Sequence, residues 1–508
     1  MGIIRWGITA GAHDASLTVF DDYDIKFAAH AERSSGVKFD KNLNNTLIEQ
    51  AMEYGDPDCV HWYETHWLKR LRQLYAKQYR TALLGLGPKS LLGSLGLDAL
   101  LVPPEDDMDV LKSVKFYNQK HHHTHASAGY YTSPFTSAAV LVIDSIGEFE
   151  TTTIWQGNGN RLTKVYSQGY PHSIGLWYSA MTQRIGLKPN EEEYILMGWS
   201  ALGDPDKYYK RIKSDFFQNT DFLGNVWDKI GFKQNLHRGC RWWAPELNTV
   251  QDYADIAAAT QKIYEEVFVN LCKRTLELTG QKNLVVMGGC GLNCVANSLA
   301  YNYFDNVWIM PNPGDAGSSL GAVAAHYKRH LDWQGPYLGY NIPGKYPTDK
   351  IIKELNTTGI VGVANGRAEF GPRALGNRSL LADPRGGDVK DRVNAVKRRE
   401  EFRPFAPVIM AEHASEHFDG PVGPYMQFTS RCKHPDLYPA IVHLDGTSRV
   451  QTVTKSEHPG LYATLKKWYE QTGCPMLLNT SLNIKGKPMV DTKADAKLWQ
   501  DTYKVKVV

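Results

Sequence analysis

Two successive segments in which an apolar strand runs into a glycine-rich loop restrict this chain to an α/β fold. The apolar residues 284–287 continue into the loop 288–293, and the apolar residues 307–310 lead to the loop 313–317. A helical pattern follows each loop. Such a loop exposes backbone N–H groups at a helix N-terminus, which is typical of anion and nucleotide sites.

Two strand–turn–strand hairpins precede these units. Residues 3–20 form the first, with His13 and Asp14 in its turn, and residues 138–155 form the second, with acidic residues in its turn. A turn of this kind can hold a phosphate or a hydroxyl group, although glycine in the first turn has a purely structural explanation as well. The repetition of hairpins and strand–loop–helix units predicts a duplicated α/β domain with a ligand between its halves.

A second domain is expected from the length of the chain. At 508 residues the chain is too long for one ordinary core, so two domains are predicted, with three as the alternative. Around residues 332–345 the composition shifts to Pro, Gly, Tyr and Asn, which we interpret as a linker. The predicted boundaries are residues 1–335 for the duplicated domain and 346–508 for a smaller α/β domain.

The composition also limits the location and the partners of the protein. Hydrophobic content of 42% and charged content of 22% are typical of a soluble globular protein, and a net charge of +3 does not by itself indicate nucleic-acid binding. No signal-peptide pattern opens the chain, and its apolar runs are far shorter than the roughly 20 residues of a membrane span. Seven scattered cysteines favour a reducing cytoplasm over a disulfide framework.

Four histidines within residues 121–125 predict a metal site. If this segment is helical, His121 and His125 lie one turn apart and project from the same face. Two imidazoles on one face provide half of the ligands of a divalent metal. Asp144, at the end of an apolar strand, and Asp315, in a glycine loop, offer two carboxylates. The alternative interpretation is a solvated histidine cluster.

Residues 61–80 lack proline and glycine and predict an amphipathic helix. One face carries Trp67, Leu71, Leu74 and Gln78. Basic residues occupy most of the other face, and a solvated basic surface is the simplest interpretation. A phosphate-contacting surface is the alternative, because aromatic rings interleave with the basic residues. Residues 81–101 show little regular pattern, and a lid is one interpretation of them.

The second predicted domain is rich in arginines that stand beside prolines, glycines and hydroxyl-bearing residues. They lie within residues 371–373, 377–379, 383–385, 397–399, 403–405 and 446–449. Single arginines of this kind are often surface ion pairs of little consequence. Six sets within about 80 residues, several of them in otherwise apolar text, instead predict a pocket for several phosphate groups.

Eight segments occur in a fixed order along almost the whole chain. They read HHHTHASAGYY, VIDSIGE, GGCGLNCVANS, NPGDAGSSLGA, EFGPRALGNRSLLADPR, KRREEFRPFAPV, HLDGTSRVQTV and LLNTSLN. Together they resemble the NodU/CmcH family of O-carbamoyltransferases. The resemblance implies a duplicated actin-like (ASKHA) ATPase-type domain followed by a YrdC-like domain. It also implies that carbamoyl phosphate and ATP give carbamoyl-adenylate in the second domain, and that the first domain transfers the carbamoyl group to an acceptor hydroxyl.

The resemblance assigns roles to residues that match the family's motifs. Its metal ligands correspond to His121, His125, Asp144 and Asp315. Its adenylate-binding loops correspond to Gly288, Gly289, Asn293 and Gly314. Its carbamoyl-phosphate and ATP pocket corresponds to Arg373, Arg403, Arg449 and Ser481, with Lys397 as a catalytic residue. His13 and Asp14 match the acceptor side, where a base takes the hydroxyl proton. Two histidines and two carboxylates suit Fe(II), Mn(II) or Zn(II), and Mg(II) accompanies ATP.

The chain departs from the family pattern at two positions. Ile195 stands where members usually carry a lysine, and Asn479 stands where an arginine can precede the threonine–serine pair. Acceptor choice in this family lies in variable loops, and such differences gather there.

We expect a hydroxyl-bearing acceptor. The aromatic, basic helix and the 13 tryptophans favour an acceptor that stacks, such as 5-hydroxymethylcytosine in DNA or in a nucleotide. A sugar or natural-product hydroxyl is the alternative. Threonylcarbamoyl transfer to tRNA, or a non-catalytic actin-like ATP-binding protein, are further alternatives that the motifs favour less. No membrane partner is expected, and the oligomeric state stays open, with a homodimer as one option.

Overall fold

The computed structural model describes residues 2–79, 82, 111, 114–219, 221, 229–399, 403 and 405–508. Its contacts divide the chain into two compact units. The first unit comprises Met1–Asp24, Lys41–Asn45 and Gly55–Asp332, and the second comprises Ile25–Asp40, Thr46–Tyr54 and Trp333–Val508. The sequence predicts a single boundary at residues 335–346 and assigns each domain one continuous stretch of chain. In the structure, the second unit also includes two short N-terminal segments.

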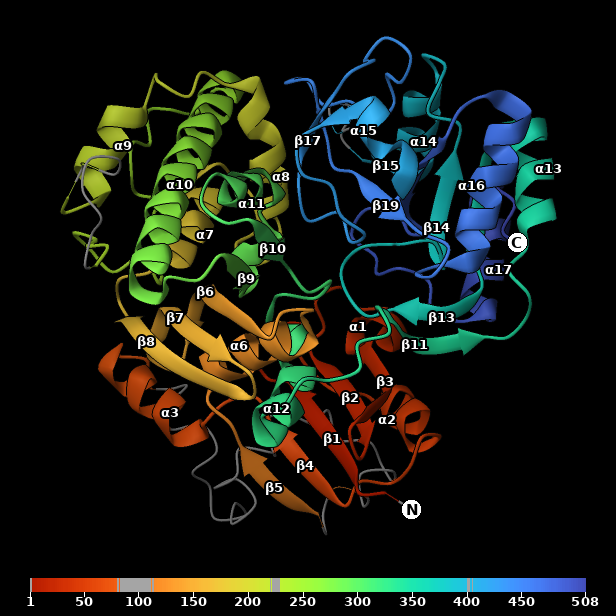
Figure 1. Ribbon diagram of the computed structural model, residues 1–508. Helices are drawn as coiled ribbons and strands as arrows, with labels where there is room; N and C mark the ends of the chain where they lie inside the picture. The colour runs from red at the N-terminus through yellow and green to blue at the C-terminus, as the bar shows by residue number, and fades with distance from the viewer. Residues whose placement is uncertain are drawn as a thin grey trace. The chain divides into compact units, whose positions relative to one another are not determined.

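Two five-stranded sheets with the same strand order occur in the N-terminal two thirds of the chain (Figure 1). The first has the order β3-β2-β1-β4-β5, and the second has the order β8-β7-β6-β9-β10. The strands of the first are β1 (Ile4–Thr9), β2 (Ser16–Asp21), β3 (Asp24–His30), β4 (Cys59–Trp62) and β5 (Lys115–Asn118). Those of the second are β6 (Ser137–Gly147), β7 (Glu150–Asn158), β8 (Arg161–Gly169), β9 (Asn283–Met287) and β10 (Asn306–Trp308).

The pairing directions of the two sheets match as well. In the first sheet, β1 and β2 form an antiparallel hairpin, and β4 runs parallel to both β1 and β5. In the second sheet, β6 and β7 form the antiparallel hairpin, and β9 runs parallel to both β6 and β10. The two predicted hairpins are therefore equivalent parts of two repeats, whereas both predicted strand–loop–helix units, which begin at β9 and β10, belong to the second repeat. The duplicated α/β fold is confirmed.

Helices of the first unit pack in layers against these sheets. Helix α12 (Ser318–Tyr327) packs on β1, α6 (His121–Thr132) packs on β6, and the two helices pack on each other. Gly321 permits this approach, because a Cβ atom there would lie 2.1 Å from the carbonyl oxygen of Thr124. The remaining helices are α3 (His66–Tyr75), α7 (Ile174–Arg184), α8 (Glu193–Trp199), α9 (Tyr209–Phe216), α10 (Val250–Thr279) and α11 (Cys294–Ser298). Gly280 ends α10 in the left-handed conformation, as its sequence predicts.

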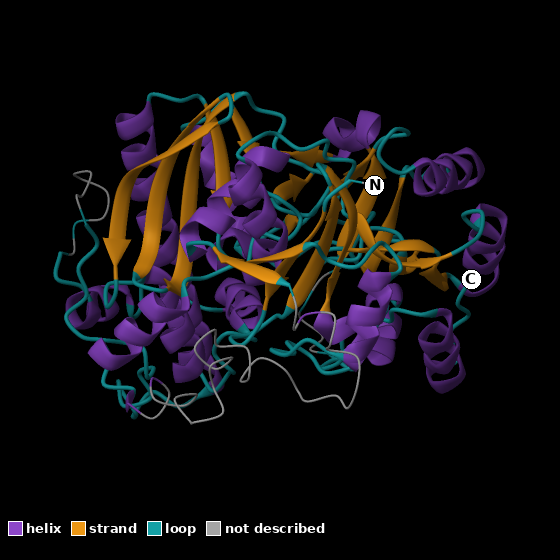
Figure 2. Cartoon of the chain, turned by 90° about the horizontal axis from the view of Figure 1, so that it is seen from below, coloured by secondary structure: helices purple, strands orange, loops and turns teal. Residues whose placement is uncertain are grey.

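The second unit is a smaller α/β assembly in which helices lie beside the strands (Figure 2). Its main sheet is mixed and has the order β12-β14-β20-β15-β19. These strands are β12 (Ile360–Ala364), β14 (Arg378–Ala382), β20 (Met476–Ser481), β15 (Ala406–Met410) and β19 (Gln451–Val453). Smaller sheets join β11 (Tyr337–Ile342) to β13 (Gly366–Glu369), and β16 (Phe418–Asp419) to β17 (Ser430–Cys432) and β18 (Thr447–Ser448). Its helices are α1 (Ala31–Ser35), α2 (Asn45–Met52), α13 (Thr348–Thr358), α14 (Val389–Lys397), α15 (Ala414–His417), α16 (Pro459–Thr472) and α17 (Lys493–Tyr503). A smaller α/β domain is confirmed, and its likeness to YrdC stays a prediction.

The structure corrects two predictions from the sequence. The proposed linker contains β11, which belongs to the second unit. The helix expected over residues 61–80 is only α3, because His61 and Trp62 complete the buried strand β4. Its exposure is also reversed: Trp67 and Leu71 are 61% and 48% exposed, whereas Arg72 is buried. Most of residues 81–101, where a lid was one interpretation, lies outside the described residues.

In the described residues, none of the helices is long and apolar enough to span a membrane.

Candidate active site

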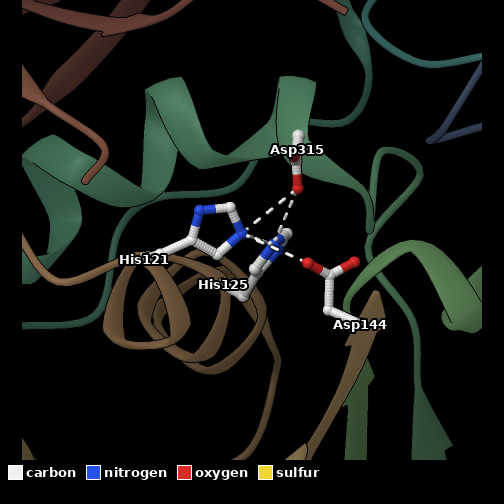
Figure 3. A group of neighbouring side chains, drawn as sticks. All are labelled: His121, His125, Asp144 and Asp315. Atoms are coloured by element: carbon white, nitrogen blue, oxygen red, sulfur yellow. Dashed lines mark hydrogen bonds and ion pairs between the residues drawn. The ribbon is translucent and has the colours of Figure 1, made fainter. Parts of the chain in front are cut away.

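Four predicted metal ligands come together in the first unit. His121 and His125 project from one face of α6 toward Asp144 on β6 and Asp315 in the loop before α12 (Figure 3). The Asp315 Oδ1 atom lies 3.3 Å from the Nε2 atom of His121 and 3.2 Å from that of His125. The Asp144 Oδ2 atom lies 3.3 Å from His121 Nε2. One ligand atom from each residue lies within 4.8 Å of all the others, and all four side chains are buried.

Local packing fixes the orientation of both histidine rings. The ring of His121 packs closely against Gly147, where a Cβ atom would stand 2.3 Å from the Cδ2 atom of His121. The Nδ1 atom of His125 lies 3.3 Å from the hydroxyl of Ser318, the first residue of α12. Because Nδ1 faces this hydroxyl, Nε2 of His125 faces Asp315. The i, i+4 spacing within a helix and the close approach of α12 together produce the cluster.

The electrostatics of the cluster fit a cation. Burial alone lowers the pKa of His121, but the charges of Asp315 and Asp144 outweigh this effect and raise that pKa well above its usual value. The same histidines hold the pKa of Asp315 well below its usual range despite its burial. Two carboxylates that are buried side by side need compensating positive charge. Two histidine nitrogens and two carboxylates converging on one point therefore fit a divalent metal ion.

The predicted acceptor-side pair adjoins this cluster. His13 Nδ1 lies 3.1 Å from Asp14 Oδ2, and His13 Nε2 lies 3.8 Å from Asp315 Oδ2. Burial opposes protonation of His13, but hydrogen bonding to Asp14 and the charge of Asp315 raise its pKa above the usual value. His13 is therefore protonated near neutral pH, and a cation bound beside Asp315 would favour the neutral ring that can accept a proton.

The two glycine loops lie next to each other beside the metal ligands. The Gly288 N–H donates to the carbonyl of Pro313, and the Gly289 N–H donates to Asp144 Oδ1. Gly288 has φ = 90°, and a Cβ atom there would lie 2.2 Å from the carbonyl oxygen of Ile143. A Cβ atom on Gly314 would stand 3.9 Å from Gly289 Cα. Only glycine fits at position 288, so the sequence signal there reflects backbone geometry.

Asn293 makes structural contacts in this arrangement. Its Oδ1 atom caps α11 by accepting the Ala296 N–H, and its amide group pairs with Gln261 in both directions. The helix expected after this loop is α11, which has only five residues and therefore a weak dipole. An adenylate contact by Asn293 stays a prediction.

Three further buried residues, to which the sequence assigns no role, lie near the cluster. The ring of Tyr63 lies 5.3 Å from that of His121. Glu148 accepts a hydrogen bond from the Thr65 N–H, and burial raises its pKa. His122 is also buried, with Nδ1 lying 3.0 Å from Thr153 Oγ1, and burial lowers its pKa to about 3. These residues come from separate elements, which only the fold brings together.

The predicted second site gathers at one edge of the five-stranded sheet of the second unit. Strand β20 is antiparallel to β14 and β15, while β15 and β19 are parallel. The carboxyl end of β20, with Ser481, therefore meets the amino ends of β14, β15 and β19 at the same edge. Arg373, Arg403 and Arg449 stand in the segments that lead into those amino ends.

Lys397 reaches this edge from the last turn of α14. Its Nζ atom donates to the backbone carbonyl and hydroxyl of Ser481 and to Asn483 Oδ1. Burial lowers the pKa of Lys397 well below its usual value, and Arg399, Arg403 and Lys38 lower it further. A buried cation among other cations is unfavourable in the free protein and becomes favourable when an anion binds.

Two of the predicted phosphate-binding arginines have structural roles instead. Arg378 is fully buried, and its guanidinium donates to the backbone carbonyls of five residues. The acceptors are Tyr340, Asn365, Gly366, Asn377 and Asp491. Arg385 pairs with Asp383 and donates to the Thr472 carbonyl. Fewer arginines are therefore available to bind phosphate than the sequence predicts.

The two departures from the family pattern do not lie in variable loops, as expected, but are buried in a helix and in a strand. Ile195 packs in the core of the first unit on α8. The Nδ2 atom of Asn479 donates to the Ala374 carbonyl and to Gln451 Oε1. Asn479 thus supports the backbone next to Arg373.

Comparisons with known proteins cover both units. The family model described as Carbamoyltransferase N-terminus matches residues 4–324, and the one described as Carbamoyltransferase C-terminus matches residues 352–508. Nodulation protein U of Rhizobium tropici is 32% identical, over 96% of this chain and 92% of its own length. Nodulation protein NolNO of Sinorhizobium fredii is 30% identical, over 95% of this chain and 76% of its own length.

Solved structures show a more distant likeness. Full-length HypF in its phosphate- and nucleotide-bound form is similar over 64% of this chain and 46% of that chain, with 12% identity and a TM-score of 0.36. A likeness at this level carries no functional assignment. Both family models and the long alignments with the nodulation proteins do carry one: the chain belongs to the carbamoyltransferase family and is a transferase enzyme.

Proposed function

We propose that this enzyme is an ATP-dependent O-carbamoyltransferase that acts in two steps. In the first, carbamoyl phosphate and water give carbamate and phosphate, and a carbamate oxygen attacks the α-phosphate of ATP to give carbamoyl-adenylate and pyrophosphate. In the second, the acceptor hydroxyl attacks the carbamoyl carbon, and AMP leaves. The observation that carries this proposal is the gathering of cationic side chains at one sheet edge of the second unit, apart from the acid–histidine cluster of the first unit.

The cationic edge suits the first step. Carbamoyl phosphate and ATP bring several negative charges, which Lys397, Arg403 and Arg373 would neutralise when they bind. Lys397 is held by Ser481 and Asn483 before any ligand arrives. Its position therefore does not depend on ligand binding, which reduces the entropic cost of aligning carbamate with the α-phosphate.

The acid–histidine cluster suits the second step. Its two histidines and two aspartates would hold a divalent ion, which acts as a Lewis acid toward the phosphate of the adenylate when bound. The nucleotide would bind at the loop that carries Gly288 and Gly289, beside these ligands. His13, at 3.8 Å from Asp315, is placed to take the proton of the acceptor hydroxyl.

A base-bearing acceptor, 5-hydroxymethylcytosine in DNA or in a nucleotide, is our proposal for the substrate. The supporting feature is α3, where the Trp67 and Tyr75 rings are 61% and 66% exposed. Helix α3 is tied to the end of β6, the strand that carries Asp144, because Arg72 Nε donates to the Glu148 carbonyl. Exposed rings near the transfer site can stack on a base, whereas Lys69 and Arg72 are occupied by Glu64 and Glu148.

Mass spectrometry of acceptors tests the proposal directly. The enzyme is incubated with carbamoyl phosphate, ATP and either hydroxymethylcytosine DNA, the free nucleotide or a panel of sugars. A mass gain of one carbamoyl group on the cytosine-containing acceptor, dependent on both co-substrates, is the expected result. If only a sugar were carbamoylated, the enzyme would still be an O-carbamoyltransferase, but hydroxymethylcytosine would be excluded as its acceptor. Product formation without ATP would exclude carbamoyl-adenylate as the intermediate.

A further inference from the structure

The segment Glu369–Arg378 connects β13 to β14 and carries Arg373. One buried carboxylate, that of Glu369, accepts hydrogen bonds from the backbone of this segment. Glu369 is 3% exposed. Its Oε1 atom accepts the backbone N–H groups of Leu375, Asn377 and Arg378 at 2.7, 2.9 and 3.2 Å. One side-chain oxygen therefore sets the path of the backbone on the carboxyl side of Arg373.

The other polar groups of this segment are satisfied by side chains from separate elements. The Leu375 carbonyl accepts from the Tyr337 hydroxyl and from Gln451 Nε2, and the Gly376 carbonyl accepts from the Tyr346 hydroxyl. The Gly376 N–H donates to Ser379 Oγ. On the amino side, Arg33 Nη2 donates to the carbonyls of Gly371 and Glu369.

Between these anchored ends lie Pro372, which is exposed, and Arg373, which is half-buried. The backbone is thus fixed before and after Arg373, while the residue itself lies at the sheet edge where the phosphate ligands are proposed to bind. A long side chain on a fixed backbone loses less conformational freedom when it binds an anion. The second carboxylate oxygen of Glu369 has no hydrogen-bond partner among the described residues. The carboxylate therefore acts through hydrogen bonds to three backbone N–H groups and through its charge, which favours the charged form of the buried Arg378.

We propose that Glu369 is a positioning residue that fixes the Arg373 loop for binding the phosphate of carbamoyl phosphate. This inference rests on the proposed function of the second unit. Glutamate is suited to this place because a carboxylate accepts all three N–H groups without bringing a donor into the core. Glutamine would bury an amide NH2 group where the second oxygen has no partner, and it would weaken the three hydrogen bonds.

A double-mutant cycle in the full chain tests the inference. Glu369→Gln, Arg373→Ala and the double variant are compared with wild type for carbamoyl-phosphate-dependent pyrophosphate release, with Glu470→Gln on the surface of α16 as the matched control. Glu369→Gln is expected to raise KM for carbamoyl phosphate about tenfold with a much smaller change in kcat. In the Arg373→Ala background, the same substitution is expected to change KM less than about twofold.

Two further measurements keep the test decisive. Ser379→Ala, which removes only the acceptor of the Gly376 N–H, should give the same non-additive pattern at a smaller size if Glu369→Gln does not fold. The shift in unfolding temperature caused by inorganic phosphate is measured across the same cycle. Equal losses in both backgrounds, or no loss in Glu369→Gln, would overturn the positioning role. The proposed reaction would instead be overturned if the wild type released no pyrophosphate while the phosphate-induced shift in unfolding temperature still showed coupling between Glu369 and Arg373.

Discussion

The two units hold opposite arrangements of charge. In the first unit, two buried carboxylates converge with two histidines, and without a bound cation the carboxylates favour a protonated His121. In the second unit, a buried lysine stands among arginines, so the site has an excess of positive charge until an anion binds. Each arrangement is unfavourable when empty and favourable when filled. In our proposal, this difference assigns the phosphate ligands to the second unit and a metal-assisted transfer to the first.

The largest expected effect is the loss of pyrophosphate release when the cationic site of the second unit is changed. Replacing Lys397 by methionine should reduce carbamoyl-phosphate-dependent pyrophosphate release by about 100- to 1000-fold, because a fixed charge at the reacting phosphates is lost. Arg403→Ala should act in the same direction. Lys466→Met, on the surface of α16, serves as the matched control and should behave as wild type. Normal pyrophosphate release by Lys397→Met would remove the second unit from the activation step.

The next effect separates the metal cluster. His125→Ala should lower carbamoyl transfer to the acceptor by about 100-fold or more. Loss of a residue that only orients a metal ligand typically lowers activity ~10–100-fold, and loss of a ligand itself should have a larger effect. Pyrophosphate release should continue. Metal content, measured by elemental analysis, should fall in the same variant and stay unchanged in the His434→Ala control. If both half-reactions fell together, the division between the units would be wrong.

A smaller effect concerns the acceptor. Trp67→Ala should weaken binding of a base-bearing acceptor about tenfold, within the 1–3 kcal/mol of one stacking contact. Trp67→Phe, which keeps an aromatic ring, should recover most of this loss. Steady-state kinetics with hydroxymethylcytosine nucleotide give both values. An unchanged KM in Trp67→Ala would exclude α3 from acceptor binding.

The smallest effect is on stability, and its sign follows from the depressed pKa of Lys397. Because this pKa is lower in the folded than in the unfolded chain, the charged lysine opposes folding at neutral pH, and this penalty disappears as the pH rises toward the ordinary lysine pKa. Relative to Lys397→Met, wild type should therefore gain stability between pH 7 and pH 10. Urea unfolding of both proteins across this range measures the difference, and a constant or reversed difference would contradict the assigned electrostatics.

Much of the fold was predictable because local patterns and the fold agree. The i, i+4 histidines, the glycine that ends α10 and the repeated hairpins each reflect backbone geometry that holds wherever the segment lies. The orientation of α3 was not predictable: its apolar stripe faces outward because Arg72 turns inward to the Glu148 carbonyl. That contact joins residues 76 positions apart, and no local pattern contains it.

The site divides in the same way. Residue types with distinctive chemistry, such as His121, His125 and Asp315, were selected correctly as neighbours, since the structure brings them within hydrogen-bonding range. Arginines were overcounted, because a buried arginine that satisfies backbone carbonyls, such as Arg378, has the same sequence surroundings as one that binds phosphate. Glu369 was not selected, because its role depends on three backbone N–H groups, which every sequence carries.

Direct detection of the intermediate tests the central claim, that activation and transfer reside in different units. His125→Ala and Lys397→Met are each incubated with carbamoyl phosphate, ATP and acceptor, quenched within one turnover, and analysed for carbamoyl-adenylate by mass spectrometry. The account predicts that carbamoyl-adenylate accumulates with His125→Ala and is absent with Lys397→Met, while neither variant gives carbamoylated acceptor. Absence of the adenylate in both variants, or its accumulation with Lys397→Met, would contradict it.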